Sequence, residues 1–271
     1  MDKKIGFIGS GNMAQAIING LIKSQISQPS QINVFDTDTS KAEALRKEVG
    51  TSIASSSKNV TENCDILIVA VKPQIIPIVL REIASSIKSY HVVVSIAAGV
   101  TLAQLAEYAG HQVKFVRVMP NTPAMVNSGM SSLTPNSLIE PNDLKDITTI
   151  FNSFGRSAVV PESQIHAVTG ISGSAPAYVF MFIEALADAG VLGGIPRDQA
   201  YQFAAQAVMG SAQMVLKTGC HPAVLKDMVC SPGGTTIEAV KTLEEHGFRS
   251  TVMDAAISCM NKSRQMSEKI N

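Results

Sequence analysis

A glycine-rich turn near the start of the chain lies between a short apolar run and a helical pattern. The run Ile5-Gly6-Phe7-Ile8 leads into Gly9-Ser10-Gly11-Asn12-Met13-Ala14, and a helix-like segment follows. Gly9 permits a tight turn, Gly11 lets the backbone approach a pyrophosphate, and Ala14 allows close packing of a helix on a strand. The pattern predicts a helix N-terminus that binds the phosphates of a dinucleotide, with a glycine turn that binds nothing as the alternative.

A second apolar run ends in an acidic residue. Ile32-Asn33-Val34-Phe35 is followed by Asp36, near where the carboxylate that binds an adenosine ribose is expected. Ser40-Lys41-Ala42-Glu43 then fits a capping box, which predicts that Ser40 starts the second helix.

Apolar runs alternate with helical segments as far as Pro161, which is typical of a parallel sheet covered on both faces. The runs 64–71, 92–96 and 113–118 end in Lys72-Pro73, Ala97-Ala98-Gly99 and Met119-Pro120-Asn121-Thr122-Pro123. Small residues at the carboxyl ends of strands leave room for a flat cofactor, although Pro and Gly also simply end strands. Two further runs, 129–134 and 157–160, are expected to extend the sheet.

The second half of the chain is helical and rich in alanine. Helices are expected over 175–189 and 200–212, separated by Gly193-Gly194, then from Pro222, from Thr235 and over 250–270. Such apolar helices cannot bury all their faces in one small bundle, so we expect a homodimer or an assembly of dimers. The chain should therefore comprise a dinucleotide-binding domain, 1–162, and a helical domain for substrate binding and dimerisation, 163–271.

Charge and composition exclude several partners. The 22 basic and 22 acidic residues give a formal net charge of zero, and no basic tract occurs, so nucleic acid and anionic membranes are not expected partners. No uninterrupted apolar run approaches the roughly 18 residues of a membrane span, and no cleavable signal precedes the first strand. The four cysteines and five histidines show no metal-ligand spacing. We expect a cytoplasmic protein with a small-molecule substrate and no metal.

The segment Ser231-Pro232-Gly233-Gly234-Thr235-Thr236 precedes another helical pattern. Its glycines allow a tight backbone, and the N–H groups that open the next helix lack intrahelical partners, so they can hold an anion. Thr235 and Thr236 add hydroxyl donors. The alternative is a turn in which one threonine is only the N-cap of the helix.

The stretch 167–216 contains no lysine or histidine. Oxidation of a hydroxy acid by a nicotinamide needs a general base, commonly one of these two residues. Reduction of a cyclic imine is less demanding, because the imine arrives largely protonated and needs only hydride and a hydrogen-bonding partner at nitrogen. A threonine hydroxyl can be that partner, while the amides of 233–236 hold a carboxylate.

Residues 222–239, PAVLKDMVCSPGGTTIEA, together with Gly173–Tyr178 and Ala70–Pro73, resemble the bacterial pyrroline-5-carboxylate reductases. The resemblance extends over essentially the whole chain. It implies an α/β protein in which a Rossmann-type doubly wound sheet is followed by an all-helical dimerisation domain. It also implies reduction of L-1-pyrroline-5-carboxylate to L-proline by hydride transfer from NAD(P)H, the last step of proline biosynthesis.

The same resemblance implies roles for individual residues. The catalytic residue would be Thr236, which would bond the imine nitrogen. Substrate contacts are implied for Ser231, Gly233, Gly234, Thr235, Thr236 and Ile237. Contacts with NADPH or NADH are implied for Ile8, Gly9, Ser10, Gly11, Asn12, Met13, Asp36, Ser57, Ala70, Val71, Lys72, Pro73, Ile96, Ala97, Ala98, Asn121 and Glu162.

Two departures from the family pattern concern the cofactor. Many relatives have a neutral or basic residue just after the second strand, whereas this chain has the acidic stretch Asp36-Thr37-Asp38. An ionised aspartate there would bond a 2′-hydroxyl and repel a 2′-phosphate, so NADH should be tolerated better than is usual. Ser57 stands where relatives often have Asn, for which Asn59 is a candidate substitute.

Two other functions stay open: a Rossmann oxidoreductase acting on another small imino or hydroxy acid, and a non-catalytic dinucleotide sensor.

Overall fold

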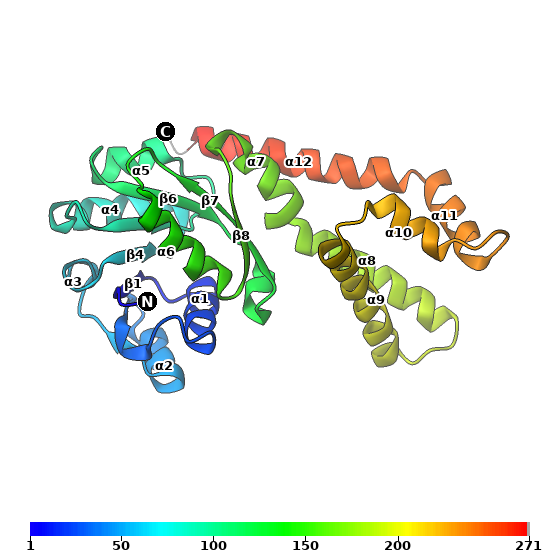
Figure 1. Cartoon of the computed structure of the whole chain (residues 1–271), viewed down its shortest axis with the longest axis horizontal. Coiled ribbons are helices and arrows are strands. Elements are labelled where there is room, and N and C mark those ends of the chain that lie inside the picture. Colours follow the sequence, from blue (N-terminus) through cyan, green and yellow to red (C-terminus); the bar gives the residue numbers. More distant parts are fainter. Residues whose placement is uncertain (270–271) are drawn as a thin grey trace. The chain divides into compact units, whose positions relative to one another are not determined.

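Eight strands form one sheet within residues 1–269, the part of the chain that the computed structural model describes. They are β1 (Ile5–Ile8), β2 (Ile32–Phe35), β3 (Ser52–Ile53), β4 (Ile66–Val69), β5 (Val92–Ser95), β6 (Lys114–Met119), β7 (Gly129–Pro135) and β8 (Gly155–Val159). Their order is β3-β2-β1-β4-β5-β6-β7-β8 (Figure 1), and neighbours are parallel except β6 and β7. The predicted strands are confirmed, with small differences at their ends.

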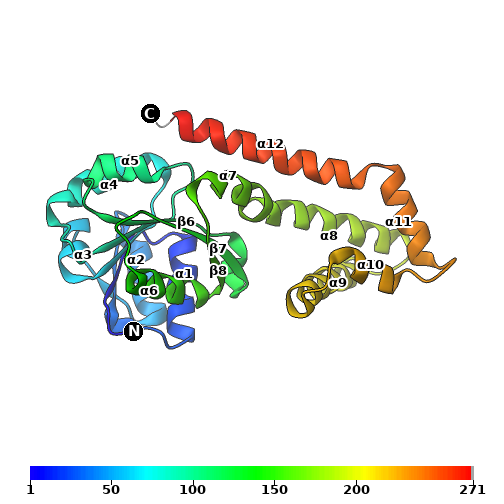
Figure 2. The same ribbon diagram turned by 45° about the horizontal axis from the view of Figure 1, so that its top comes forward.

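Helices cover both faces of this sheet (Figure 2). They are α1 (Asn12–Lys23), α2 (Thr39–Val49), α3 (Ser57–Asn63), α4 (Ile76–Ile83), α5 (Leu102–Ala109) and α6 (Pro141–Asn152). Alternate residues of β4 belong to different cores: Ile66 and Ile68 pack with α1, α2 and α6, whereas Leu67 and Val69 pack with α3, α4 and α5. Because successive side chains of a strand point to opposite faces, both faces of the sheet are buried, as in a doubly wound fold.

Helix α2 is capped two residues earlier than the sequence predicts. Asp38 is its N-cap, and the Asp38 carboxylate accepts a hydrogen bond from the Ser40 N–H at 3.2 Å. The prediction of Ser40 as the start of a capping box is therefore wrong. Aspartate and serine are equally good caps, and Asp38 comes first along the chain.

The second half of the chain consists of helices. A short helix α7 (Ile165–Val168) and a π-helical turn (Thr169–Gly173) lead into α8 (Ala175–Leu192), α9 (Arg197–Thr218), α10 (Pro222–Val229), α11 (Thr235–Glu245) and α12 (Phe248–Lys269). The predicted helices are confirmed, and Ile270, the expected last residue of the final helix, lies outside the described residues. One compact unit comprises Ser174–Ser258, and the sheet unit takes in Met1–Gly173 and the end of α12 from Cys259. The division by role at residue 162 remains a prediction.

Small residues bring α8 and α9 together. Ala187, Ala200 and Ala204 form a buried cluster, and a Cβ built on Gly190 would lie 3.3 Å from the Ala200 Cβ. Because this cluster is small, much of the apolar surface of both helices is left uncovered within one chain.

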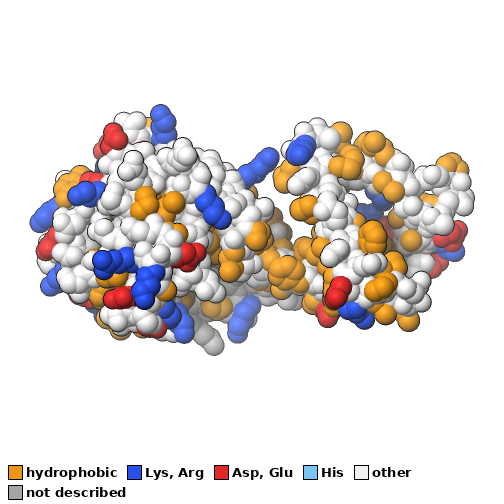
Figure 3. Space-filling model, turned by 90° about the horizontal axis from the view of Figure 1, so that it is seen from below, with side chains coloured by type: hydrophobic (Ala, Val, Ile, Leu, Met, Phe, Trp, Pro, Cys, Tyr) orange, Lys and Arg blue, Asp and Glu red, His pale blue; other side chains and the backbone are white. Residues whose placement is uncertain are grey.

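Large apolar side chains are exposed on the helical unit (Figure 3). Phe180 is 64% exposed, Leu192 90% and Phe203 67%. Among the described residues, the helical segment Glu162–Leu192 has the length and the mean hydropathy, 1.5, of a membrane span, although only 6% of that window is buried. The sequence analysis considered only uninterrupted apolar runs, and it therefore did not identify this segment as long and apolar enough for a membrane span. An exposed apolar surface of this kind marks an interaction site.

Candidate active site

The turn between β1 and α1 is fixed against the neighbouring strands. Gly9 has a φ of +99°, and its N–H donates to the Phe35 carbonyl at 2.8 Å. A Cβ on Gly9 would lie 2.5 Å from the Ala70 carbonyl oxygen. Backbone conformation and packing both require glycine at this position, and they hold the turn at the carboxyl ends of β1, β2 and β4.

Gly11 differs, because neither its backbone nor its packing requires glycine. It is the N-cap of α1, with a φ of −67° and a ψ of 177°, and no side chain caps this end of the helix. A Cβ built on Gly11 would meet no other atom within 4 Å. The open space in front of the uncapped N–H groups fits a pyrophosphate, and so these residues fit the predicted dinucleotide.

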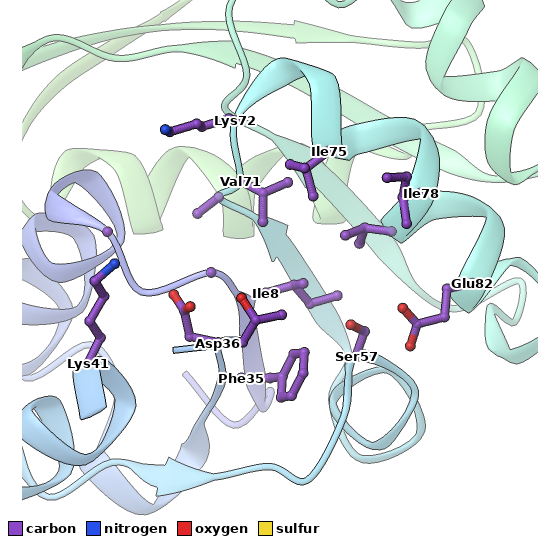
Figure 4. A pocket seen from close by; sticks show the side chains of 15 residues that line it. Ile8, Phe35, Asp36, Lys41, Ser57, Val71, Lys72, Ile75, Ile78 and Glu82 are labelled. Carbon is purple, nitrogen blue, oxygen red and sulfur yellow. The ribbon is translucent and has the colours of Figure 1, made fainter. Parts of the chain in front are cut away.

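A cavity of about 530 Å³ lies in front of this turn (Figure 4). The predicted cofactor residues that line it are Ile8, Gly9, Gly11, Asp36, Ser57, Ala70, Val71 and Lys72. It is also lined by Phe35, Thr37, Lys41, Ile75, Ile78, Val79 and Glu82, which the sequence did not single out. Open α/β sheets bind their ligands at this edge, outside the carboxyl ends of the strands.

Asp36 connects the end of β2 with the glycine turn. Its Oδ2 accepts hydrogen bonds from the Ser10 N–H at 2.7 Å and from the Ser10 hydroxyl at 2.8 Å, and its Oδ1 accepts from the Asp38 N–H at 2.9 Å. Burial would raise the pKa of Asp36, but these hydrogen bonds and the charge of Lys41 outweigh it, so the pKa lies below its ordinary value. The carboxylate is ionised at neutral pH, and the buried Ser10 supports it from outside the cavity.

Ser57 is buried at the first position of α3 and lines the cavity. The cap of this helix is Ser56, whose Oγ accepts the Asn59 N–H at 3.0 Å. Asn59, the candidate substitute for the residue found in relatives, does not line the cavity. Position 57 itself therefore borders the cavity with a hydroxyl in place of an amide.

Several predicted cofactor residues do not line the cavity. They are Asn12 and Met13 in the first turn of α1, Pro73 after Lys72, and Ile96, Ala97 and Ala98 after β5. All of them follow carboxyl ends of neighbouring strands of the sheet, as the sequence predicts. Within the described residues, no group of three or more acidic, histidine or cysteine side chains could hold a metal ion.

Asn121 and Glu162 are engaged with other parts of the sheet unit. Asn121 Oδ1 accepts the Met130 N–H at 2.8 Å, and its Nδ2 donates to the π-helical turn at 3.3 Å. Glu162 Oε1 accepts from the Leu102 N–H and from Arg117 Nη1, each at 2.8 Å. Neither residue lines the cavity, and the contacts of both join separate segments of the sheet unit.

In the helical unit, α11 begins at Thr235 without a side-chain cap. Its N-cap is Gly234, whose N–H donates to the Ser231 carbonyl at 3.0 Å, and Gly233 has a φ of +66°. The alternative in which a threonine caps this helix is therefore wrong. The N–H groups at 235–237 open the helix next to the exposed Thr235 and the half-buried Thr236, an arrangement that fits the predicted anion cradle.

Comparison with known proteins decides the family. Residues 162–266 match the family described as pyrroline-5-carboxylate reductase dimerisation, and residues 4–99 match NADP oxidoreductase, coenzyme F420-dependent. The pyrroline-5-carboxylate reductase of Escherichia coli (strain K12) is 59% identical over 268 residues, which cover 99% of this chain and 100% of that protein. The chain belongs to the pyrroline-5-carboxylate reductase family.

Solved structures of pyrroline-5-carboxylate reductases agree with this fold. That of Coxiella burnetii matches with a TM-score of 0.93 at 32% identity, covering 98% of this chain and 99% of that one. The Plasmodium falciparum pyrroline carboxylate reductase with NADP bound matches with a TM-score of 0.88 at 34% identity, covering 98% of each chain. The predicted family, fold class and enzyme class are confirmed: the chain is an oxidoreductase that uses a nicotinamide cofactor, and its dimerisation domain makes it an oligomer.

Proposed function

We propose that this chain reduces L-1-pyrroline-5-carboxylate to L-proline with NADPH or NADH, and that Thr236 is its catalytic residue. The observation that carries the assignment of Thr236 is the uncapped start of α11, where two threonine hydroxyls and three helix-opening N–H groups lie together. The carboxylate of the substrate can accept from the N–H groups, and its ring nitrogen can bond to a threonine hydroxyl.

The cofactor would be held by the residues around the glycine turn. The N–H groups that open α1 would bind its pyrophosphate, Asp36 and Ser57 its adenosine ribose, and Ala70–Pro73 together with Ile96–Ala98 would form the walls of its site. Bound NADPH or NADH supplies the hydride that the reaction needs. Glu162 would fix the second of these walls, because it accepts the N–H of Leu102 at the end of the loop that carries Ile96–Ala98, and Asn121 would fix the start of β7 through Met130.

The substrate would be held by charge and hydrogen bonds. Its carboxylate would accept from the N–H groups of residues 235–237, with Ser231, Gly233 and Gly234 shaping the turn beneath it. The imine arrives protonated, so the Thr236 hydroxyl needs only to accept and orient the N–H of the ring. Rate acceleration then comes from positioning and electrostatic stabilisation, without a lysine or histidine base.

The assembly we propose is a homodimer or a multiple of it, in the cytoplasm. The exposed apolar side chains of α8 and α9 would be covered by a second copy of the helical domain, 163–271, while residues 1–162 bind the cofactor. A chain without net charge and without a basic tract needs neither nucleic acid nor a membrane as a partner.

The deciding experiment measures the oxidation of NADPH and, separately, of NADH by the purified full-length protein given L-1-pyrroline-5-carboxylate, with proline identified as the product. Proline formation that depends on cofactor and enzyme is the expected result. Folded protein that binds the cofactor but turns over no cyclic imine would overturn the proposal in favour of a dinucleotide sensor. Turnover of a different imino or hydroxy acid alone would favour another oxidoreductase.

A further inference from the structure

The cavity that holds the predicted ribose site contains two groups of opposite charge. Asp36 and Lys41 both line it, and Figure 4 shows them at the same end, away from Ile78 and Glu82. A carboxylate at this position accepts from a ribose 2′-hydroxyl, whereas an ammonium group attracts a 2′-phosphate. The choice between NADH and NADPH therefore depends on which of the two groups is free to act.

Asp36 has one hydrogen-bonding position to spare. Each oxygen of a carboxylate offers two lone pairs. Oδ2 uses both of its own on the N–H and hydroxyl of Ser10, while Oδ1 accepts one hydrogen bond, from Asp38 N–H at 2.9 Å. The second lone pair of Oδ1 is sufficient for one ribose hydroxyl. The hydrogen bonds from Ser10 also fix the direction of the carboxylate.

Lys41 is already engaged by an anion of the protein. Its Nζ lies 3.4 Å from Asp38 Oδ2. The other oxygen of Asp38 accepts from the N–H and the hydroxyl of Ser40, so the same carboxylate also caps the positive end of α2. Asp38 thus occupies both features that would attract a 2′-phosphate, the ammonium group and the helix N-terminus.

We infer that Asp36 and Asp38 together make this enzyme select NADH over NADPH. Asp36 is the acceptor for the 2′-hydroxyl, and Asp38 is the built-in counter-ion that keeps Lys41 and the start of α2 from a 2′-phosphate. Two carboxylates face one ammonium group, so a phosphate carrying about two negative charges meets net repulsion. This inference rests on the proposed use of the cavity for the adenosine ribose.

The test is a binding measurement on the purified full-length protein without substrate. Dissociation constants are measured for NADH and NADPH and for the probes 5′-AMP and 2′,5′-ADP, which differ only in the 2′-phosphate. We expect NADH and 5′-AMP to bind at least about tenfold more tightly than their 2′-phosphorylated counterparts, a factor that corresponds to 1.4 kcal/mol. Tighter binding of NADPH by the unmodified protein would overturn the inference.

Three variants separate the local effect from net charge. Asp38→Asn keeps a good N-cap but loses the counter-ion, so it should tighten NADPH binding several-fold and leave NADH nearly unchanged. Adding Lys41→Gln to it should abolish that gain, because the released ammonium group is then missing. The control Glu43→Gln makes the same change of charge in α2 away from the cavity lining and should leave the ratio unchanged. Equal ratios in Asp38→Asn and Glu43→Gln would overturn the role of Asp38.

Turnover measurements keep this inference distinct from the proposed function. If the NADH preference is found in binding but pyrroline-5-carboxylate is not reduced, the reaction is wrong and the selectivity stands. If proline forms and NADPH has the higher kcat/KM and the lower dissociation constant, the reaction stands and the selectivity is wrong.

Discussion

The buried guanidinium of Arg117, on β6, donates from Nη1 to Glu162 Oε1 at 2.8 Å. The same oxygen accepts the N–H of Leu102, the first residue of α5, at 2.8 Å. One carboxylate thus neutralises a buried cation and satisfies an N–H at the start of a helix. Glu162 connects the sheet with the segment that leads into α7.

Removing this carboxylate should destabilise the sheet unit. Glu162→Ala leaves Arg117 buried without its anion and the Leu102 N–H without an acceptor, so we expect the free energy of unfolding to fall by about 2 to 4 kcal/mol. Urea denaturation followed by circular dichroism measures it. Glu107→Ala, which removes an exposed carboxylate from α5, is the control. A loss no larger than in that control would show that Glu162 contributes nothing to stability.

The two glycines of the first turn should respond differently to alanine. Gly9→Ala should lower the free energy of unfolding by about 1 to 3 kcal/mol, because of the φ of +99° and the contact with Ala70. Gly11→Ala should change it by less than about 1 kcal/mol but weaken cofactor binding at least about tenfold, since its methyl group enters the cavity. Denaturation and cofactor titration of both variants test this. Unchanged cofactor binding by folded Gly11→Ala would refute the phosphate site.

The sequence predicts the glycine turn, the strands and the position of Asp36 at the end of β2 well, because each of them rests on a local pattern. A short apolar run directly before a glycine turn favours a buried strand, and a small residue at 14 suits close packing. Asp38 escaped prediction for a local reason as well: two good caps, Asp38 and Ser40, lie two residues apart, and the capping-box pattern favours the wrong one.

Contacts between distant segments could not be predicted. Lys41 and Ile78 reach the cavity only because the first turn of α2 and one face of α4 follow β2 and β4, the two strands on either side of β1. Polar residues such as Asn121 follow strand ends whether they bind a ligand or tie two loops together. The antiparallel direction of β7 is another example, since an apolar run has the same pattern in either direction.

Acidification should weaken the fold before carboxylates are protonated. His91 is 1% exposed, its Nδ1 accepts the Lys88 N–H at 2.7 Å, and burial lowers its pKa below the ordinary 6.5. The folded state therefore favours the neutral ring, and its contribution to stability is complete above pH 6.5 and is lost as the pH falls towards the folded pKa. Burial also lowers the pKa of His166, so this histidine likewise reduces the free energy of unfolding as the pH falls.

The measurement is the free energy of unfolding between pH 7.5 and 5, above the range in which Asp36 and Asp143, with pKa values below 3.8, lose their charge. We expect a decline that His91→Gln makes shallower. His111→Gln serves as the control for an exposed histidine. A slope that is the same in both variants would show that His91 does not cause the decline.

Thr236 should matter for the chemical step more than for folding. Thr236→Ala removes the hydroxyl proposed to accept from the imine N–H, so kcat should fall by about one to two decades, as the loss of a transition-state hydrogen bond does. Thr236→Ser keeps the hydroxyl and should restore most of kcat. Thr242→Ala, in the same helix with its hydroxyl bonded to the Glu238 carbonyl at 3.2 Å, is the control and should leave kcat nearly unchanged. Equal kcat in the unmodified protein and Thr236→Ala would remove this hydroxyl from the mechanism and leave the helix-opening N–H groups of α11 as the whole of the substrate site.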